Sequence, residues 1–158
     1  PRATLDMRHY FLLHERPDRS GRHVLSYSTR FGYTGTHTPI YEHFFAGGFS
    51  TLRGFDYRGA SPVSGNVRVG GEFQWLNSLE YLYPISADDM IRGIVFCDFG
   101  TVEPEIQIED FRVAPGVGLR IIVPAMGPAP IALDIAWPIV RADYDEQEQF
   151  SFHIGFQR

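Results

Sequence analysis

The sequence is poor in cysteine, in long apolar runs and in cations, three features that are typical of other classes of protein. Cys97 is the single cysteine among 158 residues, so no disulfide can form within the chain. No run of eighteen apolar residues occurs, which excludes a transmembrane helix. Cations are few as well, with 14 Lys+Arg against 19 Asp+Glu. The resulting net charge of -5 argues against a general nucleic-acid binder.

Aromatic residues, in contrast, are abundant at 15% of the chain, and such residues favour strands. Seven segments alternate apolar and polar residues with the period of two that is typical of a β-strand, and none has the period of a helix. The predicted strands are about Ala3–His14, His23–Tyr33, Val67–Tyr83, Met90–Phe99, Phe111–Val123, Ile131–Val140 and Gln149–Arg158.

The polar face of these strands carries charges far from the strand ends, at Glu80, Asp98, Arg120 and Asp134. Short turns also alternate with longer loops along the chain, as in outer-membrane barrels. A soluble antiparallel sandwich remains an alternative on periodicity alone. We predict an all-β, antiparallel transmembrane β-barrel whose polar face lines the lumen. The residues expected to face lipid are Phe73, Trp75, Leu79, Ile121, Leu133, Ile135, Phe150 and Phe152.

The longest predicted connection, residues 34–66, contains a glycine-rich stretch, GGFSTLRGFDYRG at 47–59. This stretch is too polar and too rich in glycine for a strand or a helix. It places one cation, Arg53, between Leu52 and the pair Gly54-Phe55. A loop of fixed shape among two-faced strands suggests a plug or latch, although an ordinary loop arginine is the alternative without further information.

Other candidate sites are weaker. His37 and His43 with Glu42 have a loose spacing for metal ligands, and we expect no metal site there. Glu80 and Asp98 resemble a pair for acid–base chemistry, but no nucleophile or phosphate-binding loop accompanies them. We therefore expect no enzymatic activity and no cofactor. Cys97 lies on the apolar face and is expected to be inert.

Five motifs occur in one order: LRGF (52–55), GGEFQWLNSLEYLYPI (70–85), FCDFG (96–100), APGVGLRIIVPAMGP (114–128) and FSFHIGF (150–156). In this order they resemble the C-terminal part of the BamA-type outer-membrane insertase family. That family includes TamA, two-partner secretion transporters and organelle import barrels, and the motifs do not separate these branches, although the PAMGP turn and the last strand favour BamA.

The resemblance implies a sixteen-stranded barrel preceded by POTRA domains. Residues 1–158 would then be the last seven strands, with 34–66 as a long extracellular loop that folds into the lumen. Because the chain opens at Pro1 in strand-like sequence and without a signal peptide, we expect a fragment that lacks its N-terminal part. Its two open sheet edges are not tolerated in lipid, so we expect the fragment alone to aggregate or to need its missing half.

The resemblance also implies the functional residues. Arg53 of the motif Leu52, Arg53, Gly54 and Phe55 is expected to pair with Glu80 and Asp98 on the inner wall. The last strand is expected to form a lateral gate through Phe150, Phe152, Ile154, Gly155 and Phe156, loosened by its glycine.

The implied function is the folding and insertion of β-barrel proteins in the outer membrane, with no enzymatic step. The expected partners are unfolded barrel polypeptides, outer-membrane lipid and accessory lipoproteins, and not nucleic acid. A polypeptide-secreting transporter, a passive porin-like channel and a soluble binding module are the alternatives.

Overall fold

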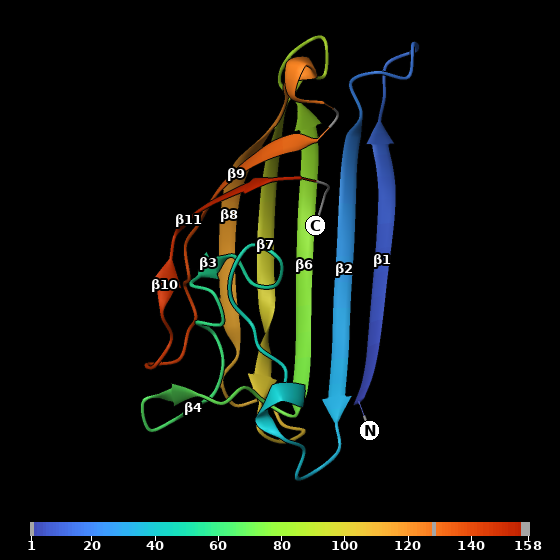
Figure 1. Cartoon of the computed structure of the whole chain (residues 1–158). Helices are drawn as coiled ribbons and strands as arrows, with labels where there is room; N and C mark the ends of the chain where they lie inside the picture. The colour runs from blue at the N-terminus through green and yellow to red at the C-terminus, as the bar shows by residue number, and fades with distance from the viewer. Residues whose placement is uncertain (1, 128, 156–158) are drawn as a thin grey trace.

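The computed structural model describes residues 2–127 and 129–155. Their main element is one curved antiparallel sheet of seven strands, accompanied by two small two-stranded sheets (Figure 1). The strand order is β1-β2-β6-β7-β8-β9-β11. The bounds are β1 Arg2–His14, β2 His23–Thr34, β6 Phe73–Pro84, β7 Ile91–Glu103, β8 Arg112–Ile122, β9 Pro130–Ala136 and β11 Phe150–Ile154. Each main strand thus pairs with the next main strand in the chain, as in a meander. In the described residues, no helix is long and apolar enough to cross a membrane.

Three predicted strands have clearly different limits in the structure. The strand predicted over Met90–Phe99 continues as β7 to Glu103, where residues 100–103 pair with residues 73–76 of β6. The end of the predicted last strand, residues 156–158, lies outside the described residues. Val67–Arg68 is not the start of the third main strand but a short strand, β5, paired with β4 (Val63–Ser64). Gly70 has a φ of +70°, which breaks the extended backbone before β6 begins at Phe73. The predicted strand Ile131–Val140 ends at Ala136, because Pro138 cannot donate to a ladder.

The register places apolar side chains on one face and charged ones on the other. One row across five strands contains Tyr81, Val95, Val117, Ile135 and Phe150, each directly opposite the next. Val95, Val117, Ile135 and Phe150 are all 42–54% exposed. The opposite face holds the buried groups, including Asp98 and Asp134. This arrangement is the reverse of a soluble sheet, in which the apolar face is buried, and it fits the predicted lipid face.

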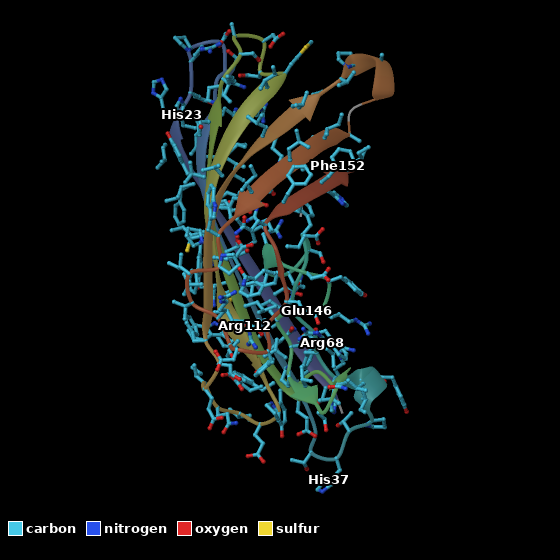
Figure 2. The ribbon with its side chains drawn as sticks, turned by 90° about the vertical axis from the view of Figure 1, so that its left-hand side faces the viewer. His23, His37, Arg68, Arg112, Glu146 and Phe152 are labelled. Carbon is cyan, nitrogen blue, oxygen red and sulfur yellow. The ribbon has the colours of Figure 1, made fainter. Side chains whose placement is uncertain are left out.

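The connection between β2 and β6 spans residues 35–72 and lies on the concave face of the sheet (Figures 1 and 2). We call this segment the lumenal loop. It contains the 3-10 turn Ile40–Glu42 and the short strand β3, Gly54–Phe55. β3 pairs with β10, Gln147–Glu148, which lies just before the last strand. A second 3-10 turn, Pro124–Met126, lies between β8 and β9.

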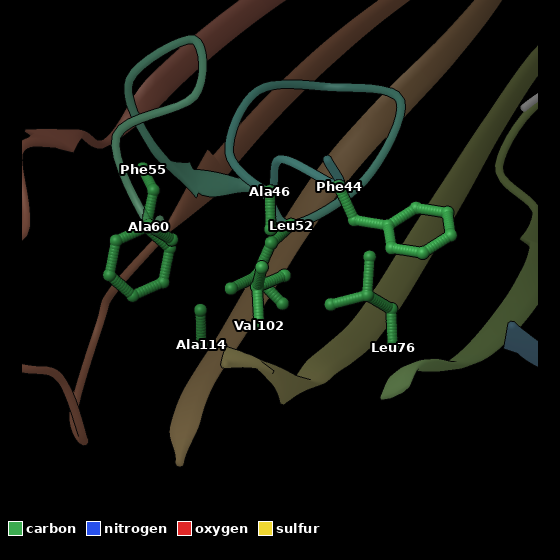
Figure 3. Packing of buried hydrophobic residues seen from close by; sticks show 8 residues of the cluster. All are labelled: Phe44, Ala46, Leu52, Phe55, Ala60, Leu76, Val102 and Ala114. Atoms are coloured by element: carbon green, nitrogen blue, oxygen red, sulfur yellow. The ribbon is translucent and has the colours of Figure 1, made fainter. Parts of the chain in front are cut away.

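The lumenal loop is packed against the sheet by a compact hydrophobic cluster (Figure 3). The loop contributes Phe44, Ala46, Leu52, Phe55 and Ala60, and the sheet contributes Leu76, Val102 and Ala114. All eight side chains are at most 5% exposed. Burying side chains of this kind contributes roughly 1.5–3 kcal/mol for each large one. The loop is therefore an ordered part of the fold, and it has its own core.

Candidate functional site

Arg53 is the centre of a buried ionic cluster on the concave face of the sheet. Its Nε donates to Oδ2 of Asp98 at 2.8 Å, and its Nη2 donates to Oδ1 of the same carboxylate at 2.8 Å. Its backbone N–H also donates to Asp98, at 3.0 Å. Nη2 lies 2.5 Å from Oε1 of Glu80. The structure thus brings together Arg53, Glu80 and Asp98, the three residues expected to form the latch.

Three further groups complete the cluster, and sequence reasoning did not assign them to it. Asp134 accepts from Nη1 of Arg53 at 3.3 Å, and Ser78 accepts from Nη2 at 3.2 Å. The guanidinium carbon lies 3.4 Å from the centre of the Phe96 ring, which is a cation–π contact. The alternation in β9 had placed Asp134 on the polar face. What the alternation could not indicate is that this face curls toward Arg53.

Asp134 is shared between two arginines. Arg120 donates to Oδ1 at 2.6 Å through Nη1 and to Oδ2 at 2.9 Å through Nη2. Gly118 leaves the space for this carboxylate, because a β-carbon there would lie 1.8 Å from Oδ1 of Asp134. The glycines of β8 therefore allow the Asp134 side chain of the neighbouring strand β9 to approach the β8 backbone closely.

The electrostatics of the cluster favour a permanently charged Arg53. The side chains of Arg53, Asp98 and Asp134 are 0% exposed, and that of Glu80 is 24% exposed. Burial by itself would lower the pKa of Arg53. The charge and hydrogen bonds of Asp98, followed by the charges of Glu80 and Asp134, outweigh burial and raise this pKa above its ordinary value. The arginine guanidinium is planar and carries five N–H donors, so it can bind several carboxylates at once, which a lysine ammonium cannot.

The residues that flank Arg53 fix its backbone. Leu52 and Phe55 are 0% and 1% exposed and belong to the hydrophobic cluster under the loop. Gly54 has a φ of +92°, a conformation that side chains with a β-carbon rarely adopt. Gly54 and Phe55 form β3, whose partner is Glu148 and Gln147 of β10. The LRGF motif, residues 52–55, is therefore attached in two ways. The Arg53 side chain binds the sheet, and the backbone of Gly54–Phe55 pairs with β10, just before the last strand.

The last strand, β11, is short. It pairs with β9 over five residues, Phe150 to Ile154, whereas β7 and β8 pair over ten. Phe150, Phe152 and Ile154 are 50–55% exposed and lie on the apolar outer face. Gly155 follows the strand with a φ of +145°. Phe156, the remaining predicted gate residue, lies outside the described residues, so the gate remains a prediction.

A second buried ion pair, Arg112–Asp145, holds the segment between β9 and β11 against β8. Arg112 donates to Asp145 through Nε at 2.7 Å and through Nη2 at 2.9 Å, and both side chains are 0% exposed. Tyr144 donates its hydroxyl to Asp110 and accepts from Arg112 at 3.3 Å. This cluster ties residues 137–149 to β8 and has a structural role.

The loop histidines do not assemble with Glu42 into a ligand set. Both ring nitrogens of His43 face backbone carbonyls, Val69 O at 2.8 Å and Thr38 O at 2.9 Å. Figure 2 places His37 at the far end of the loop, away from the sheet. In the part of the chain that the structure describes, no three His, Cys, Asp or Glu residues form a group that could hold a metal ion.

Comparison with known proteins agrees with this geometry. The SAM50-like protein CG7639 of Drosophila melanogaster is 28% identical over 130 residues, which are 77% of this chain and 29% of that protein. The crystal structure of BamA from Haemophilus ducreyi lacking POTRA domains 1-3 superposes with a TM-score of 0.74 at 22% identity. That match covers 96% of this chain and 34% of the BamA chain. The chain thus spans about a third of the length of these proteins.

The likeness to BamA supports a partial barrel as the fold, with an antiparallel main sheet of seven strands. The family model for the Omp85 superfamily domain matches residues 2–157, almost the whole chain. Proteins of this kind are barrels of the outer membrane, which agrees with the apolar outer face and the charged inner face. On this evidence the chain belongs to the Omp85 superfamily.

Proposed function

We propose that this chain is the C-terminal part of a barrel that folds and inserts β-barrel proteins into the outer membrane. The observation that carries the proposal is that the lumenal loop is held firmly in place by Arg53 while the last strand, β11, is short. The loop fills the concave face around Arg53, and β11 pairs with β9 over only five residues. A strand edge with unpaired N–H and C=O groups is a template for a further strand.

In this proposal the edge of β11 is one side of a lateral gate. A strand of an unfolded barrel polypeptide pairs with it by backbone hydrogen bonds, and successive hairpins follow into the lipid. No covalent chemistry is involved, so no cofactor or metal takes part. The outer, apolar rows of β7, β8 and β9 contact outer-membrane lipid, and accessory lipoproteins are the further partners we expect.

A polypeptide-secreting transporter of the same superfamily is the second candidate. The filled lumen is unfavourable for a passive porin-like channel, because the loop occupies the space through which solutes would pass. A transporter would need to withdraw the loop from the lumen and would not need to open the strand edge. The two candidates therefore differ in which element has to move.

The test is a reversible disulfide in the full-length protein between β11 and the first strand of the barrel. Cys97 is replaced by serine first, so that no other thiol of this chain competes. Assembly of an unfolded barrel substrate in proteoliposomes should stop when the bond forms and return on reduction. A single-cysteine variant is the control. Full assembly activity in the cross-linked form would contradict the lateral mechanism, and secretion that survives it would favour the transporter.

A further inference from the structure

The lumenal loop contacts the last strand directly, in addition to its contacts with the wall. Phe49, near the middle of the loop, stacks on His153 of β11 with ring centres 4.6 Å apart and planes 15° apart. Offset stacking at this distance is a favourable aromatic geometry. In the β9–β11 register the residues beside His153, Phe152 and Ile154, point outward, so His153 points to the concave face, where the loop lies.

A second contact holds the segment that leads into β11. Asp56 N donates to Glu146 O at 3.0 Å, and Glu146 N donates to Gly59 O at 3.1 Å. These bonds extend the β3–β10 pairing on the concave side. Arg68 adds an ion pair with Glu146 at 3.1 Å, and Figure 2 shows the two residues side by side below β11. The loop therefore holds the chain both before and within the last strand.

These contacts are continuous with the ionic cluster. Arg53 and Arg120 share Asp134, and the Arg120 guanidinium lies 5.8 Å from the centre of the Phe49 ring. The path from the latch to the last strand thus runs through Asp134, Arg120 and Phe49 to His153. β11 has only five residues paired with β9, so the two attachments to the loop add substantially to what holds the strand on this side.

We propose that Phe49 and His153 are positioning residues of the last strand, so that the lumenal loop sets how firmly the strand edge is held. With the loop latched, β11 is held at His153 and at Gln147–Glu148. When the loop is displaced, β11 loses both attachments and is held by its strand ladders alone, so that its edge pairs more readily with an incoming strand. This inference rests on the proposed function, because it assigns a control element to the same gate.

The test measures amide hydrogen exchange of residues 149–155 in the full-length barrel. Phe49→Ala should speed exchange there roughly two- to tenfold, the range expected for the loss of one aromatic pair. Phe49→Tyr should restore the wild-type rate, since it keeps the ring. Phe45→Ala is the matched control, because Phe45 contacts Arg58 and the region of Gly70 within the loop. Phe49→Leu replaces Phe49→Ala if the latter does not fold.

Exchanging the partners gives a stricter readout. The double variant Phe49→His with His153→Phe retains a ring on each side, and it should recover slow exchange that either single change to alanine loses. Equal exchange of β11 in the wild type, Phe49→Ala and Arg53→Ala would overturn the inference while leaving the proposed function intact. If Phe49→Ala speeds exchange of residues 149–155 but neither the wild type nor any variant assembles a barrel substrate, the proposed function is contradicted. The link between the loop and the last strand is then supported.

Discussion

The contact between Arg53 and Asp98 makes the most specific prediction about this chain. Arg53→Ala removes two side-chain hydrogen bonds of 2.8 Å to Asp98. The Asp98 carboxylate, which is 0% exposed, then lacks the positive charge that balances its own. Asp98→Ala leaves the guanidinium with Glu80 and Asp134. In the full-length protein both changes should release the lumenal loop and impair assembly, with most of the β-structure kept.

The magnitude follows from the burial of both partners. Removing one member of a buried ion pair costs about 3–5 kcal/mol, because the other charge stays buried. The double variant removes both charges together, so it should be little worse than either single one. The expected coupling energy is then about 3 kcal/mol, well beyond the scatter of about 0.3–0.5 kcal/mol for independent sites.

The assay is urea unfolding of the full-length barrel in liposomes, together with protease cleavage of the lumenal loop. Arg53→Lys keeps the charge but loses the fork, and it should resemble Arg53→Ala in loop cleavage more than the wild type. The control cycle combines Arg53→Ala with Asp145→Ala, whose partner is Arg112, and should be additive. Additive losses for Arg53 and Asp98, or a loop no more cleavable than in the wild type, would refute the latch.

Three further predictions concern the wall and the outer loops. Gly118→Ala should destabilise the barrel by about 1–3 kcal/mol, because its β-carbon would lie 1.8 Å from Asp134 Oδ1; unchanged urea unfolding would contradict the packing described above. Val117→Arg should cost about 2–4 kcal/mol if this position is at mid-bilayer, and Val117→Leu close to nothing. An arginine tolerated there would contradict the lipid face. Burial and the hydrogen bond to Asp110 raise the pKa of Tyr144 from 10.0 to about 12. The neutral phenol is therefore favoured in the fold, and its contribution is full below pH 10.0 and lost as the pH rises through about 12. Ultraviolet titration of the full-length protein should show a late phenolate step that Tyr144→Phe removes, and an unchanged titration curve would contradict this assignment.

Much of the fold follows from the sequence, because period-two alternation is a local property. The seven main strands, their antiparallel order and the inward direction of Glu80 and Asp98 all depend on which side of a strand each residue lies. The structure confirms the strands and their faces and changes only some limits. Two of the corrected ends were also marked locally, by Gly70-Gly71 before β6 and by Pro138 after β9.

The remaining features depend on contacts between distant segments, and only the tertiary structure decided them. Asp134 meets Arg53 because the sheet curls, and curvature is not encoded in the alternation of any single strand. The pairing of Gly54–Phe55 with Gln147–Glu148 involves two residues on each side, too few for any periodic pattern. The stack of Phe49 on His153 joins a loop to a strand about a hundred residues later, and its formation requires the loop to be folded back over the completed sheet.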